Sequence, residues 1–119
     1  MALFLVVDDS SFSRKITAKM LENLGHEVIH AGDGEECMAA LKDNNPDCVI
    51  MDLLMPGKNG EEVLKDLRQA GINIPVIIQT ADVQDSVQKS CIASGANGLV
   101  TKPFNADKLS AMISEVMKG

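Results

Sequence analysis

The chain has 119 residues, 45% hydrophobic and 24% charged, and this is enough to bury one core but not two. We therefore expect a single domain over residues 1–119, with no output domain. The net charge is −6 and the basic residues are scattered, which argues against direct binding to nucleic acid. No apolar run approaches the ~20 residues that span a bilayer, and three dispersed cysteines argue against disulfides or zinc. We expect a cytoplasmic protein with protein partners and no membrane contact.

Five short runs rich in apolar residues predict strands, and the segments between them have the length and pattern of helices. The runs are Leu3–Val7, Glu27–Ala31, Cys48–Met51, Val76–Gln79 and Gly98–Thr101. The first, third and fourth are almost uninterrupted Leu, Val, Ile and Met, which is typical of central strands covered on both faces. The alternation predicts a doubly wound α/β fold: a five-stranded parallel sheet with five helices, and a ligand site beyond the carboxyl ends of the strands.

The segment after the first strand carries apolar residues at intervals of four: Phe12, Ile16, Met20 and Leu24. With charged residues between them, they predict an amphipathic helix that covers the sheet with this face. Ser10 or Ser11 is expected to cap its start. Glycines expected to end helices are Gly25, Gly71 and Gly95 in the left-handed conformation, and Gly119 at the last helix.

Polar residues that can carry chemistry stand at the expected strand ends: Asp8, Asp9, Asp52, Thr80 and Lys102. Because parallel strands end at one edge of a sheet, we expect these side chains to converge. Two like charges about 4 Å apart repel by about 4 kcal/mol at an effective dielectric constant of about 20, so three carboxylates need a cation. An all-oxygen site suits Mg²⁺ better than zinc. Asp9 and Asp52 are the expected direct ligands, with Asp8 binding through water or orienting the others.

Phosphoryl transfer to a carboxylate is the chemistry that these parts indicate. Lys102 supplies an ammonium group that can neutralise a phosphoryl oxygen, and the Thr80 hydroxyl can donate to another. Four motifs then carry a resemblance that extends over essentially the whole chain: Val6–Ser10, Met51–Gly57, Thr80–Ala81 and Thr101–Phe104. With these motifs in this order, the sequence resembles the response-regulator receiver domains of two-component signalling.

This resemblance implies that Asp52 is the phosphoacceptor and receives its phosphoryl group from a phosphohistidine of a sensor histidine kinase. It implies Mg²⁺ bound by Asp8, Asp9, Asp52 and the backbone carbonyl of Leu54, and a flavodoxin-like sheet of order 2-1-3-4-5. A receiver catalyses its own phosphorylation and dephosphorylation and is otherwise no enzyme. Without an output domain, the chain is similar to single-domain chemotaxis regulators.

The resemblance also implies a switch, in which Thr80 and the adjoining Ala81 move toward the phosphoryl group. Most relatives place an aromatic residue three positions before the lysine, and here that position is Leu99. The peptide bond before Pro103 is commonly cis in relatives, which helps to aim Lys102. We expect the output surface to comprise Asp82–Ser94, the fifth strand and the last helix. It would bind an unidentified target protein, the chain being a monomer or a weak phosphorylation-dependent dimer.

Three other functions remain as alternatives. A haloacid-dehalogenase-like phosphatase would need D-x-D after the first strand, whereas Asp8 and Asp9 are adjacent. A flavin or nucleotide carrier would need a Gly- or Thr-rich phosphate loop, whereas three carboxylates here would repel phosphate in the absence of metal. A receiver-like adaptor that acts by contact alone would not need every part required for phosphorylation.

Overall fold

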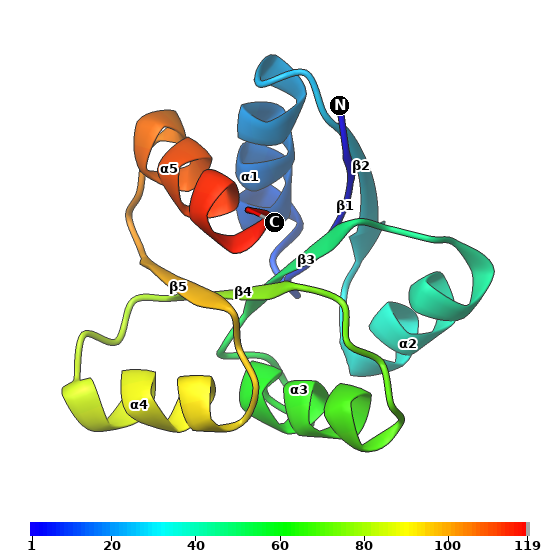
Figure 1. Cartoon of the computed structure of the whole chain (residues 1–119), viewed down its shortest axis with the longest axis vertical. Coiled ribbons are helices and arrows are strands. Elements are labelled where there is room, and N and C mark those ends of the chain that lie inside the picture. Colours follow the sequence, from blue (N-terminus) through cyan, green and yellow to red (C-terminus); the bar gives the residue numbers. More distant parts are fainter. Residues whose placement is uncertain (119) are drawn as a thin grey trace.

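The computed structural model describes residues 1–118, within which five strands and five helices alternate (Figure 1). The elements are β1 (Leu3–Val7), α1 (Ser11–Asn23), β2 (Glu27–Ala31), α2 (Gly34–Asp43), β3 (Cys48–Asp52), α3 (Gly60–Gln69), β4 (Val76–Thr80), α4 (Asp85–Ala93), β5 (Gly98–Thr101) and α5 (Ala106–Val116). All five predicted strands are confirmed. Two run one residue further than predicted, so that β3 ends on Asp52 and β4 on Thr80. Gly119, expected to end the last helix, lies outside the described residues.

The strands form one parallel sheet of order β2-β1-β3-β4-β5, which confirms the predicted fold. Helices α1 and α5 cover one face, and α2, α3 and α4 cover the other (Figure 1). As expected, the interior strands are β1, β3 and β4, and every residue of β3 and β4 is buried. Because Val7 lies opposite Met51, and Asp52 opposite Gln79, the carboxyl ends of these three strands form a row at one edge.

The predicted buried face of α1 is wrong for three of its four residues, whereas Met20 is half-buried and packs against the core. Phe12 is 75% exposed, Ile16 44% and Leu24 37%, whereas the buried residues of α1 are Thr17, Ala18 and Leu21. Residues at intervals of four drift around a helix of 3.6 residues per turn by about 120° over three steps, so such a stripe does not stay on one face. The observed face follows spacings of three and four, and its smaller side chains lie against the sheet. An apolar strip of α1 is therefore left exposed to solvent.

Local signals fix most helix ends. Of the two serines predicted as caps of α1, Ser10 fills this role and accepts a hydrogen bond from the backbone N–H of Ser13 at 3.2 Å. Gly25, Gly71 and Gly95 have φ values of 92°, 77° and 112°, which confirms the predicted left-handed conformation. Among residues 1–118, no helix is long and apolar enough to cross a membrane.

Candidate functional site

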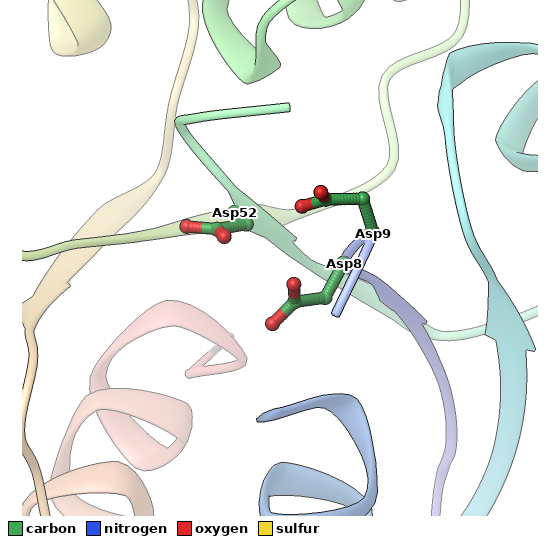
Figure 2. A group of neighbouring side chains, drawn as sticks. All are labelled: Asp8, Asp9 and Asp52. Atoms are coloured by element: carbon green, nitrogen blue, oxygen red, sulfur yellow. The ribbon is translucent and has the colours of Figure 1, made fainter. Parts of the chain in front are cut away.

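Three carboxylates meet where β1 and β3 end. Asp8 and Asp9 follow β1 directly, and Asp52 is the last residue of β3. One oxygen from each carboxylate lies within 4.8 Å of the other two, and Figure 2 shows the side chains projecting into a common space. Asp8 and Asp52 are buried, whereas Asp9 is exposed. The predicted convergence is therefore present, with one of its three members open to solvent.

Asp8 is fully buried, and both of its carboxylate oxygens accept hydrogen bonds. The backbone N–H of Ser10 donates to Oδ1 at 3.0 Å, and the side-chain amide of Gln79 donates to Oδ2 at 3.2 Å. An ionised carboxylate only accepts and has about four lone-pair positions, so two donors leave it able to bind a cation as well. These bonds fix the orientation of the carboxylate.

Lys102 follows β5 and supplies the positive charge of the site. Its Nζ lies 3.3 Å from Asp52 Oδ2 and 3.8 Å from Asp8 Oδ2, and it donates to Ser13 Oγ at 3.4 Å. The Lys102–Pro103 peptide bond is cis, as the family resemblance led us to expect. Burial raises the pKa of the Asp52 carboxyl; Lys102 opposes this effect, and the nearby Asp8 adds to it. The site thus holds more negative charge than its own lysine offsets, which favours an added cation.

Thr80 is buried, with 2% of its surface exposed. Among residues 1–118, its hydroxyl makes no hydrogen bond to the three carboxylates. Its Oγ1 accepts a hydrogen bond from the backbone N–H of Asp82 at 3.0 Å. The hydroxyl proton remains available to an acceptor, because a hydroxyl can donate and accept together.

The remaining predicted positions surround the site. Leu99 is half-buried and packs against the core on the side of α2, α3 and α4, whereas Ala81 and Pro103 are exposed. The Leu54 side chain is 72% exposed. The metal-binding role of the Leu54 carbonyl and the switching roles of Ala81, Leu99 and Pro103 stay predictions.

The donor set fits a hard divalent cation. The three side chains that meet here are all carboxylates, and Mg²⁺ prefers oxygen ligands at a partly open position, whereas zinc favours histidine and cysteine. The cysteines Cys37, Cys48 and Cys91 are buried elsewhere. The arrangement can therefore hold a divalent cation among the three carboxylates, with the Lys102 ammonium group next to Asp52.

Sequence reasoning missed two features beside the carboxylates. The first is Gln79, whose only signal was a polar residue in an otherwise apolar run. The second is an apolar groove of about 440 Å³ between α1 and the loop that joins β5 to α5, lined in part by Phe12, Ile16, Met20, Lys102 and Phe104. The sequence signal for this groove is the apolar stripe of α1, which its spacing assigns to the core.

Comparisons with known proteins agree with this geometry. The family model described as "Response regulator receiver domain" matches residues 4–114. "Chemotaxis protein CheY" of Halobacterium salinarum is 32% identical over 95% of this chain and 94% of its own length. "Probable transcriptional regulator ycf27" of Porphyridium aerugineum is 36% identical over 96% of this chain, which spans 47% of that protein. The solved structure of Vibrio cholerae chemotaxis protein CheY4 superposes with a TM-score of 0.90 at 32% identity, covering 98% of both chains.

Proposed function

The chain belongs to the response regulator receiver domain family, and we propose that Asp52 accepts a phosphoryl group from a phosphohistidine of a sensor histidine kinase in a Mg²⁺-dependent reaction. A receiver domain is a phosphoacceptor signalling module and not a classical enzyme, and it implies a histidine kinase partner. One observation carries the proposal: the Asp52 carboxylate lies 3.3 Å from the Lys102 ammonium group and within 4.8 Å of carboxylate oxygens of Asp8 and Asp9.

The proposed chemistry assigns each group a task. An oxygen of Asp52 forms a bond to phosphorus while the bond from phosphorus to the donor nitrogen breaks, which leaves an acyl phosphate on Asp52. Lys102 neutralises one phosphoryl oxygen from its present side of the carboxylate. When bound by Asp8, Asp9, Asp52 and the Leu54 carbonyl, Mg²⁺ supplies positive charge for the transferred group.

The proposed readout begins at Thr80. When its hydroxyl moves to donate to the phosphoryl group, the Asp82 N–H that donates to Thr80 Oγ1 moves with it and draws the segment before α4 inward. The start of α4 is coupled to this movement, because the Gln84 N–H donates to Asp82 Oδ1 at 2.9 Å and the Gln84 side chain makes no capping bond of its own. We propose that α4, β5 with Leu99, and α5 form the surface that binds an unidentified target protein. Two of the similar proteins are chemotaxis proteins, and they suggest chemotaxis as the pathway of this chain.

The exposed face of α1 supports a protein as the donor. Phe12 and Ile16 line the apolar groove that reaches Lys102, so a partner seated there would be next to the phosphoacceptor. An exposed aromatic residue beside a reactive site is typical of a protein contact. We propose that the phosphohistidine-bearing domain of the kinase packs against this groove.

Intact-mass measurement tests the chemistry. We expect acetyl phosphate and Mg²⁺ to add the mass of one phosphoryl group to the native chain, and EDTA to prevent the addition. Asp52→Asn should remain unmodified, whereas Asp43→Asn, which removes an exposed carboxylate at the end of α2, should be modified like the native chain. Equal modification of Asp52→Asn and the native chain would contradict the proposal.

A further inference from the structure

Gln79 is a polar residue where the fold otherwise places apolar ones. It lies on an interior strand, follows Val76, Ile77 and Ile78, and is 0% exposed. A buried amide without partners costs about 1–3 kcal/mol, so a core position of this kind needs hydrogen bonds to compensate. The partners of Gln79 indicate what the residue does.

The Gln79 amide has two recorded side-chain partners. Its Nε2 donates to Asp8 Oδ2 at 3.2 Å, and its Oε1 accepts from Thr17 Oγ1 at 3.4 Å. This orientation is dictated by chemistry, because an ionised carboxylate has no proton to donate and would repel the amide oxygen. The Thr17 hydroxyl supplies the proton that the amide oxygen accepts. Helix α1, strand β4 and the acidic cluster are thereby joined in one chain of hydrogen bonds.

The charge of this donor matters for cation binding. Lys102 Nζ is 3.8 Å from Asp8 Oδ2 but 3.3 Å from Asp52 Oδ2, so the groups that donate hydrogen bonds to the Asp8 carboxylate are the neutral Gln79 amide and Ser10 N–H. Neutral donors hold the carboxylate plane without offsetting its charge. Lys102 at 3.8 Å offsets part of the negative charge of Asp8, and the neutral donors fix the direction of the carboxylate without offsetting more of it.

We propose that Gln79 is a positioning residue for the divalent cation, acting through Asp8, and that Thr17 fixes the Gln79 amide in the orientation this requires. The inference rests on the proposed Mg²⁺-dependent function and adds the residues that orient one of the carboxylates. Groups that orient metal ligands change metal affinity by about 10–100-fold when they are removed. We therefore expect Gln79→Leu, which keeps a similar volume but removes the donor, to weaken Mg²⁺ binding about tenfold or more.

Calorimetric titration of the full chain with MgCl₂, without any phosphodonor, measures this effect. Ile77→Val is the matched control, because Ile77 is equally buried on the same face of β4 and contacts the core instead of the carboxylates. We expect the control to bind Mg²⁺ like the native chain. Unchanged affinity in Gln79→Leu, or equal weakening in both variants, would overturn the inference and leave the proposed function intact. A native chain that binds no Mg²⁺ would overturn both.

A double-mutant cycle separates positioning from general packing. Thr17→Val should weaken Mg²⁺ binding by about twofold to fivefold alone, but have no further effect in the Gln79→Leu background, because its action passes through the amide. Additive losses would refute the role of Thr17.

Acetyl phosphate kinetics give a second measurement. In Gln79→Leu, the Mg²⁺ concentration for half-maximal phosphorylation should rise about tenfold, with the rate at saturating Mg²⁺ within about twofold of native. A lower saturating rate at unchanged half-maximal Mg²⁺ would refute positioning through Asp8. If Gln79→Leu does not fold, the Thr17→Val titration decides: unchanged affinity there overturns the inference.

Discussion

Gly60, the first residue of α3, is predicted to be intolerant of a single added methyl group. A Cβ at this position would lie 2.3 Å from the Asp52 carbonyl oxygen and 3.1 Å from the Asp52 carbonyl carbon. Both are backbone atoms of β3 and cannot rotate away. Because non-bonded carbon atoms settle at about 3.5–4.0 Å, the start of α3 has to move by about 1 Å. That movement stretches the 2.8 Å hydrogen bond from Gly60 N–H to the Leu53 carbonyl.

We expect Gly60→Ala to cost about 2–4 kcal/mol, from overpacking and the weakened hydrogen bond together. Gly34→Ala is the matched control: Gly34 also opens a helix after an Asx cap, but its added Cβ meets a methyl group of the buried Val63 side chain at 2.8 Å and no backbone atom of another element closer than 3.9 Å. Its cost should be about 1 kcal/mol lower than that of Gly60→Ala, because a side chain repacks more readily than strand backbone. Urea unfolding followed by far-UV circular dichroism measures both, and equal costs within about 0.5 kcal/mol would refute the reasoning.

Three further predictions concern the site and its surfaces. Phe12→Ala should slow phosphotransfer about tenfold from a histidine kinase that labels the native chain, but leave labelling by acetyl phosphate unchanged; equal slowing with both donors would contradict the docking groove. Asp52→Asn should raise the melting temperature in EDTA at neutral pH, because burial raises the pKa of this carboxyl and its ionised form destabilises the fold. The gain in melting temperature should vanish below pH 3.8, the ordinary pKa of an Asp carboxyl, because the carboxyl is then uncharged in both the folded and the unfolded chain. A gain that persists below this pH would contradict the explanation. Hydrogen bonds from Ser90 and Ser94 lower the pKa of Glu61, so their link between α3 and α4 is present above pH 4.5 and weakens as the pH falls. Hydrogen exchange should therefore show α4 losing protection in acid in the native chain but not in Glu61→Gln, and identical pH profiles would contradict this.

The fold was predictable because its signals are local. Uninterrupted apolar runs indicated the interior strands, and glycines such as Gly25 marked helix ends through the backbone conformation they adopt. The meeting of Asp8, Asp9 and Asp52 followed from topology, since parallel strands end at one edge. The strand order came from the family resemblance and not from the pattern itself.

The errors came from properties that depend on tertiary packing. Spacing alone assigned Phe12 and Ile16 to the core, although the sheet is covered by Thr17, Ala18 and Leu21. Apolar character does not distinguish a core face from an exposed binding face, because both are rich in the same side chains.

Gln79 shows a second limit. Its partner Asp8 is 71 positions away in the sequence, and Thr17 is 62. A polar residue in an apolar strand signals that a partner exists, but only the folded chain identifies which one.

The position of the phosphoryl group is the most direct test of the central claim. After labelling with acetyl phosphate and Mg²⁺, borohydride reduces an aspartyl phosphate to homoserine, which tandem mass spectrometry can locate in a digest. We predict homoserine at position 52, with none at Asp8 or Asp9 and none when Mg²⁺ is omitted. Homoserine at either neighbouring aspartate, or an unmodified Asp52 in a labelled chain, would contradict the account.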